Sequence, residues 1–141
     1  AHWAKTAFDL LYTLGLIDAR KLDPSAPVGK EEFASLLARA LGIEDTGVLT
    51  DGVQELVEGV LSREGMMIMT ERALEAAGKS ADSQASLAAF SDADDLSAQA
   101  KSSAAKLVAA GIIRGTNGKL APQEPLTKAQ AAMVVFRLLW K

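Results

Sequence analysis

Apolar side chains recur at helical spacing along this 141-residue chain. Residues 30–41 place five of them at the i, i+3, i+4, i+7 and i+8 positions of one helical face: Phe33, Leu36, Leu37, Ala40 and Leu41. Residues 3–14 and 53–60 show the same period, and residues 129–140 carry a broader apolar stripe. The pattern therefore predicts an all-α fold.

Two long stretches of the chain repeat one another. Residues 119–140 match residues 21–42 at an offset of 98, and the identical pairs include Lys21/Lys119, Leu22/Leu120, Pro24/Pro122, Pro27/Pro125, Lys30/Lys128 and Arg39/Arg137. Residues 98–113 match residues 2–17 at an offset of 96, and both end in a glycine followed by two apolar residues. Glycine is a natural C-terminal stop for a helix, so each match predicts a helix–loop–helix unit.

A third, degenerate copy is predicted between these two. Its first helix is expected over residues 53–61, which end in Gly59-Val60-Leu61. Its second helix is expected to begin near Thr70, because residues 69–72 parallel residues 126–129. We assign repeat 1 to residues 1–45, repeat 2 to residues 50–79, a Ser/Ala/Asp-rich linker to residues 79–89 and repeat 3 to residues 90–141.

Composition excludes several classes of protein. The chain has no cysteine and a single histidine, His2, so it offers no thiolate or His-pair metal site and no Ser-His relay. It also lacks an apolar run long enough to span a bilayer. We therefore expect no enzyme, no metal, no cofactor and no membrane insertion.

Charge is divided unevenly along the chain. Residues 101–141 contain seven Lys or Arg and one acidic residue, whereas residues 1–100 contain eight Lys or Arg and 17 acidic residues. This division indicates either an anionic partner for the C-terminal part or internal neutralisation of the acidic part. The basic part lacks the interleaved aromatic residues of nucleic-acid-binding surfaces, so we expect no nucleic-acid partner.

Capping residues mark the predicted starts of the second helices. Thr127 followed by Gln130 forms a capping box, in which each side chain accepts a hydrogen bond from the other residue's backbone. Gly29 with Glu32 is a weaker version, because glycine offers no side-chain acceptor. Thr70 is expected to cap the helix of the middle copy.

Cations at these helix starts are the first candidate binding residues. Lys30 and Lys128 occupy the first helical position, where a positive charge opposes the helix dipole, and Arg72 follows one step later in the middle copy. Capping does not explain a cation there. A cation beside free helix N–H groups is suited to an anion, so we predict anion contacts for these residues.

Each of the other candidate binding residues has two interpretations. Trp3 is suited either to stacking on a sugar ring or to the core of the first helix. Three residues of the third loop either line a groove or simply form a turn: Arg114, Gly115 and Asn117. The acidic residues of 92–95 favour a solvated turn before a helix over a calcium site, and residues 66–69 favour core filling over a flexible binding surface.

These motifs together resemble the S-layer homology family. The resemblance lies in His2-Trp3-Ala4, in the Gly-Leu-Ile and Gly-Ile-Ile helix ends, in Phe90-Ser91-Asp92, in Gly118-Lys119-Leu120-Ala121-Pro122 and in residues 126–132, which are similar to the family's Ile-Thr-Arg-Ala-Glu motif. It implies three tandem copies in a pseudo-threefold helical prong, with the second helices at the centre. In the family, the motif arginines face grooves between copies and hold an anionic secondary cell-wall polymer. On the alignment above no copy has arginine at that position, and Glu71 predicts an inactive pocket in the middle copy.

The resemblance implies a non-covalent cell-wall anchoring module. Its partner would be an anionic cell-wall polysaccharide or a peptidoglycan-linked polymer, and the chain would be a monomeric fragment of a larger exported protein, located outside the cell at the bacterial wall or S-layer. The alternative is a degenerate repeat that serves as a spacer or protein-interaction domain without binding glycan. The predicted ligand-binding residues are Lys30, Lys128, Thr127, Gly29, Arg72, Trp3, Arg114, Gly115 and Asn117.

Overall fold

A computed structural model describes residues 26–56, 59–79, 84–115 and 118–139 of the chain. Over these ranges the fold is all-α, as predicted, and extended backbone is limited to isolated bridges. The helices are α2 (Lys30–Leu41), α3 (Gly47–Thr50), α4 (Arg63–Ala76), α5 (Ala98–Ala109) and α6 (Lys128–Leu139), with a 3₁₀ turn η3 (Ala93–Asp95) before α5. The helix predicted within residues 2–17 lies outside the described residues.

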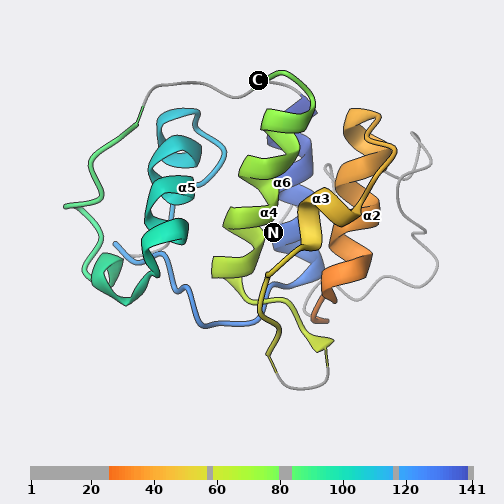
Figure 1. Ribbon diagram of the computed structural model, residues 1–141. Coiled ribbons are helices and arrows are strands. Elements are labelled where there is room, and N and C mark those ends of the chain that lie inside the picture. Colours follow the sequence, from red (N-terminus) through yellow and green to blue (C-terminus); the bar gives the residue numbers. More distant parts are fainter. Residues whose placement is uncertain (1–25, 57–58, 80–83, 116–117, 140–141) are drawn as a thin grey trace.

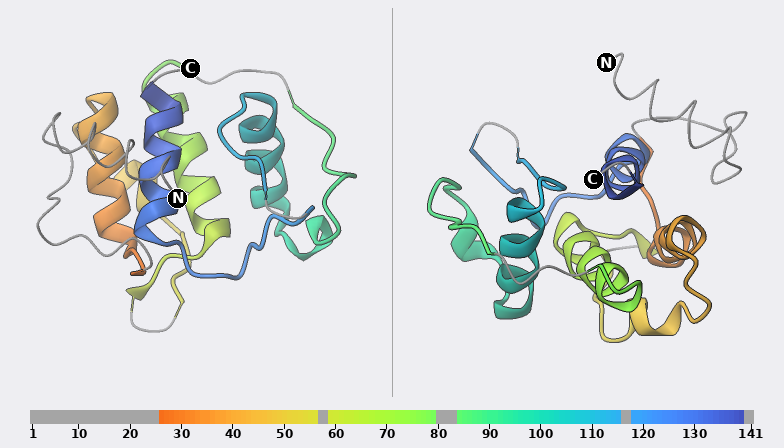
Figure 2. Two further views of the ribbon diagram at one scale, coloured as in Figure 1. Left: turned by 180° about the vertical axis from the view of Figure 1, so that it is seen from behind. Right: turned by 90° about the horizontal axis from the view of Figure 1, so that it is seen from above.

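Helices α2, α4 and α6 form a triangle when the molecule is viewed along their axes, and α5 lies beside α4 (Figures 1 and 2). Helix α2 packs against both α4 and α6. Most of the largest side chains with almost no exposed surface come from these three helices and from the segments before them, and α3, α5 and the loop before α6 add the rest: Phe33, Leu37, Leu49, Leu61, Met66, Met67, Met69, Leu107, Leu120, Leu126 and Val135. The methionines of residues 66–69 are therefore core residues, as expected. Over the described ranges, no helix has both the length and the apolar character that crossing a bilayer requires.

A closed ring of backbone hydrogen bonds joins the segments that precede these three helices. The N–H of Val28 donates to the carbonyl of Leu126 at 2.9 Å, Leu126 donates to Leu61 at 2.8 Å, and Leu61 donates to Val28 at 2.8 Å. Bridges flank the ring in the same cyclic order: Pro27 with Thr127, Ser62 with Pro125, and Gly29 with Val60. We call the three bonds the backbone ring. It fixes the starts of α2, α4 and α6 relative to one another.

The predicted start of the middle helix is wrong by about two turns. Helix α4 begins at Arg63, and the hydroxyl of its N-cap residue Ser62 accepts a hydrogen bond from Gly65 at 3.0 Å. Thr70 lies in the interior of α4 and is fully buried, so it caps nothing. Serine is among the strongest N-cap residues, and its position directly after the ring residue Leu61 makes it the cap.

The helix predicted over residues 53–61 is also wrong. The described part of this segment holds a tight reversal, with a bridge between Glu55 and Leu61 and a bond of 2.8 Å from the Leu56 N–H to the Val60 carbonyl. The short helix α3 lies earlier in the chain. Gly59 has the positive φ of a helix stop, at 77°, but the bridge between Glu55 and Leu61 shows that the residues on either side of it pair as extended backbone. The apolar residues of this segment thus follow a helical spacing without forming a helix.

Candidate functional site

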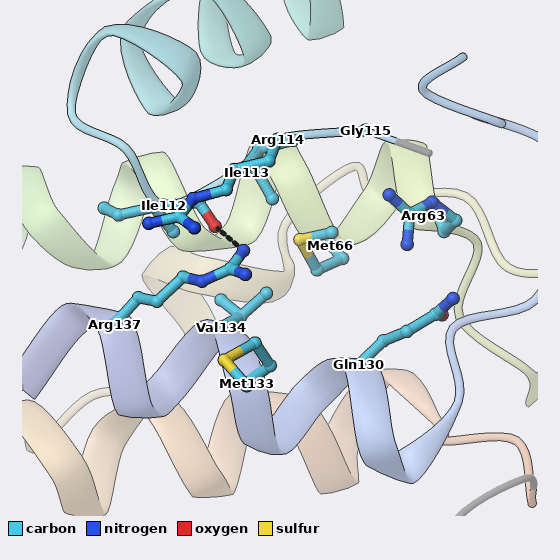
Figure 3. Close-up of a pocket in the computed structure, with 10 residues that line it drawn as sticks. All are labelled: Arg63, Met66, Ile112, Ile113, Arg114, Gly115, Gln130, Met133, Val134 and Arg137. Carbon is cyan, nitrogen blue, oxygen red and sulfur yellow. Dashed lines mark hydrogen bonds between the residues drawn. The ribbon is translucent and has the colours of Figure 1, made fainter. Parts of the chain in front are cut away.

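A pocket of about 200 Å³ opens between α4, α6 and the loop that follows α5 (Figure 3). The loop is placed by Gly111, whose φ of 77° ends α5, and by the bond of 2.9 Å from Ile112 N–H back to the Leu107 carbonyl. The pocket lining comprises Arg63, Met66, Ile112, Ile113, Arg114, Gly115, Gln130, Met133, Val134 and Arg137. It contains three arginines and no acidic residue.

The polar groups gather at the two ends of this lining. Arg114 and Arg137 lie together at one end, and Arg63 and Gln130 lie at the other (Figure 3). The surface between them is apolar and comes from both helices: Met66, Met133 and Val134. A pocket with this pattern is suited to a ligand that carries negative charge on an otherwise weakly polar body, such as an acidic sugar.

The two arginines contributed by helices are fixed by backbone carbonyls. Arg63 Nε donates to the Leu120 carbonyl at 2.8 Å, and Arg137 Nη1 donates to the Ile112 carbonyl at 3.0 Å. Burial lowers the pKa of Arg63, while the nearby Asp92 carboxylate acts to raise it. Burial also lowers the pKa of Arg137, and repulsion from Arg114 lowers it further. Burial and the repulsion from Arg114 both disfavour the charged form of Arg137. An anion bound between Arg114 and Arg137 would therefore be stabilising.

The wall beside the pocket is built by the Phe90-Ser91-Asp92 motif. The Asp92 carboxylate accepts bonds from the N–H groups of Leu120 and Ala121, at 2.9 and 2.8 Å. Desolvation acts to raise the pKa of Asp92, but these two bonds and the charge of Lys119 outweigh it, so the pKa is lowered. The motif therefore holds the carbonyl of Leu120 in place for Arg63.

Gly115 is required at its position in the lining for two reasons. Its φ of 73° is one that glycine adopts without strain. A Cβ atom there would lie 2.6 Å from the ring of Phe90 and 2.8 Å from the carbonyl oxygen of Lys119. The glycine thus allows the loop to pass closely over Phe90.

The structure divides the predicted site residues into four groups, of which Arg72 alone is one. Arg114 and Gly115 line the pocket together. Four residues lie at the starts of α2 and α6, outside its lining: Gly29, Lys30, Thr127 and Lys128. Trp3 and Asn117 lie outside the described residues.

The residues at the starts of α2 and α6 have partners of their own. Thr127 and Gln130 form the predicted capping box, with bonds of 3.2 and 3.0 Å. Lys30 Nζ donates to the Val53 carbonyl at 3.2 Å and lies 3.5 Å from a Glu55 oxygen. Lys128 Nζ lies 2.8 Å from a Glu32 oxygen. Contact of these lysines with a ligand stays a prediction.

Arg72 does not occupy the position that the sequence alignment gave it. Its Nη1 donates to the carbonyls of Leu49 and Asp51, at 3.2 and 2.6 Å, and so ties α4 to the end of α3. The first residue of α4 is Arg63, in the position that Lys30 holds in α2 and Lys128 in α6. Arg63, and not Arg72, therefore stands at the start of α4.

Arg63, Gln130 and Arg137 complete the pocket without having been predicted to bind. A signal for Arg63 was present in the sequence, because residues 61–64 read Leu-Ser-Arg-Glu and follow the same order as Leu126-Thr127-Lys128. The alignment instead matched Met69-Thr70 to Leu126-Thr127, so Arg63 was not considered. Arg137 was visible as a repeated position, and Gln130 as a cap.

The comparison with protein families finds a match in the region predicted as repeat 3. The S-layer homology domain model matches residues 89–132, which include the Phe90 motif, α5, the pocket loop and the start of α6. This domain is a non-catalytic module that anchors proteins at the cell wall or surface. An amylopullulanase of Thermoanaerobacterium thermosulfurigenes is 24% identical to this chain over an alignment of 170 positions. The alignment covers 99% of this chain and 9% of that protein. The chain thus spans less than a tenth of the length of this curated relative.

Proposed function

We propose that this chain is a cell-wall anchoring module that binds an anionic wall polysaccharide in the pocket between α4 and α6. The observation that carries the proposal is the set of three arginines around an acid-free pocket with an apolar centre. Carboxylate groups of an acidic polymer would pair with the guanidinium groups, which present two N–H donors in the plane that a carboxylate requires. The apolar surface of Met66 and Met133 would contact the face of a sugar ring.

We further propose that the chain consists of three S-layer homology copies, whose second helices are α2, α4 and α6. The backbone ring supports this reading, because each helix is preceded by a segment with the same pair of bridges and the same hydrogen bond. The motif of the middle copy then lies at residues 61–64 instead of residues 69–72. The assignment to an exported protein at the bacterial wall is supported by the family match to residues 89–132, which corresponds to one of the three proposed copies.

The proposal is tested by pulldown with cell-wall sacculi that carry or lack their acid-extractable polysaccharide. Arg114 is the residue to change, because it is exposed and is placed at the pocket by its loop. We expect Arg114→Gln to fold as the parent does and to reduce binding about tenfold, since a hydrogen bond to a charged group is worth roughly 1.5–3 kcal/mol. Arg39→Gln is the matched control, because Arg39 is an exposed arginine in the last turn of α2, outside the pocket lining.

Equal binding of the parent to both kinds of sacculi would contradict the proposal. So would equal loss in the two variants, because it would indicate that general positive charge, and not the pocket, is responsible. A parent protein that binds neither preparation would favour the alternative of a spacer or protein-interaction domain.

A further inference from the structure

The starts of α2, α4 and α6 are built alike, and each places a cation directly after its N-cap residue. Lys30 follows Gly29, Arg63 follows Ser62 and Lys128 follows Thr127. All three N-cap residues directly follow a member of the backbone ring. The molecule therefore presents three corresponding positions at which a cation could hold an anionic ligand.

Two of the three cations already have an internal carboxylate. Lys128 Nζ is 2.8 Å from Glu32, and Lys30 Nζ is 3.5 Å from Glu55. The lysine side chains are 30% and 19% exposed and their glutamate partners 54% and 36%, so the lysine is the more shielded member of each pair. Among the described residues no carboxylate lies within ion-pair distance of Arg63, whose Nε donates to the Leu120 carbonyl. The nearby Asp92 carboxylate acts to raise the pKa of Arg63, but its hydrogen bonds are to the N–H groups of Leu120 and Ala121.

The charge at the three positions differs accordingly. Each lysine with its glutamate sums to zero, so an approaching anion meets no net positive charge and must displace a carboxylate that is tethered nearby. A tethered group competes at a high effective concentration, which a dilute ligand does not match. The pocket that begins at the start of α4 has Arg63 at this end and Arg114 with Arg137 at the other, and no acidic residue in its lining. The attraction for an anion is therefore concentrated there.

We propose that this module holds one polymer segment per chain, at the start of α4, and that Glu32 and Glu55 close the two corresponding positions as internal counter-ions. The inference rests on the proposed function, and it adds which of the three positions is open and what closes the others. It assigns a ligand-excluding role to Glu32, in addition to its place in the Gly29 capping box, and to Glu55. Replacing Glu32 or Glu55 by a neutral residue should allow a second anion to bind, at Lys128 or at Lys30 respectively.

The experiment is a calorimetric titration of the full chain with short anionic oligosaccharides cut from purified wall polysaccharide. We expect one binding event per chain for the parent. Glu32→Gln should add a second event, because the amide keeps the oxygen that accepts from the Gly29 N–H, at 3.4 Å in the structure, but no longer neutralises Lys128. Adding Lys128→Gln to that variant should remove the second event. Glu55→Gln is the parallel test at Lys30.

The outcomes separate this inference from the proposed function. A parent that binds two or three oligosaccharides would overturn the inference and leave the function standing. An unchanged stoichiometry in both glutamate variants, with native circular dichroism, would also overturn it. A parent that binds none would overturn both. A single event in the parent together with a second event in either variant would support it.

Discussion

Asp92 shows how one side chain shapes the site without entering it. Its carboxylate binds the N–H groups of Leu120 and Ala121, and the carbonyl of Leu120 in turn holds Arg63. The chain of contacts runs from an acidic residue, through a loop, to the guanidinium that lines the pocket. A change at Asp92 should therefore affect both the stability of the loop and the position of Arg63.

We expect Asp92→Asn to lower the stability of the protein at pH 7 by on the order of 1 kcal/mol, a charge-assisted contribution reduced by its partial exposure. Because folding lowers the pKa of Asp92, its contribution is present above the unfolded pKa of about 3.8 and is lost as pH falls through the folded value. The difference in Tm between parent and variant should therefore narrow as the pH is lowered from 7 to 3. A constant difference would show that the charge of Asp92 is not what holds the loop.

The sequence predicts some of these residue roles and not others. The Thr127–Gln130 capping box was predictable because both partners lie within one turn and need no knowledge of the fold. For Arg114 and Gly115 the loop sequence left two interpretations open, a groove lining or a simple turn, and the structure places both residues in the pocket lining. The pairing of Lys128 with Glu32, 96 residues apart, depends on the packing of α2 against α6 and leaves no local trace.

Among the elements, α4 is the one that differs most from expectation. Two Ser/Thr residues compete as its cap, Ser62 and Thr70, and local sequence favours both. Tertiary contacts determine which of the two is the N-cap, because the hydrogen bonds of Leu61 in the backbone ring keep the chain extended up to Ser62. Residues 66–70 then become buried, and the hydroxyl of Thr70 has no hydrogen-bond partner among the residues that the structure describes.

This arrangement predicts opposite effects for two changes in one helix. Ser62→Ala should lower the free energy of unfolding by about 0.5–2 kcal/mol through loss of the cap. Thr70→Val should raise it, because the shape is kept and an unsatisfied buried hydroxyl, worth about 1–3 kcal/mol, is removed. Urea denaturation of both variants measures the difference. If Thr70→Val were the more destabilised of the two, the placement of the α4 start would be contradicted.

At the scale of the whole molecule, charge is separated in space as well as in sequence. The chain carries a net charge of −3 at pH 7, yet the lining of the pocket is positive and free of acidic residues. The sequence showed the basic C-terminal part, and Arg63 joins it in the structure from the acidic part of the chain. An anionic polymer would thus be attracted locally by a protein that repels it overall.

Binding of wall polysaccharide should therefore weaken as salt concentration rises. Exposed charges are screened over about 8–10 Å at ~0.1–0.15 M salt, and Arg114 is exposed. Titrations at increasing sodium chloride should show a steady loss of affinity, with a smaller dependence in Arg114→Gln because one charge contact is gone. A flat response in the parent would indicate that stacking and neutral hydrogen bonds dominate.

The backbone ring also constrains when this protein can fold during its synthesis. The bond between Leu61 and Val28 joins residues made early, but the other two bonds both need Leu126, which follows Val28 by 98 residues. Contacts so distant in sequence form slowly, because the chain entropy of closing a long loop must be overcome first. During synthesis the Val28 N–H and the Leu61 carbonyl therefore lack these partners until Leu126 has left the ribosome. The segment that leads into α6 completes the ring, so the starts of α2 and α4 are fixed relative to α6 only after it has been made.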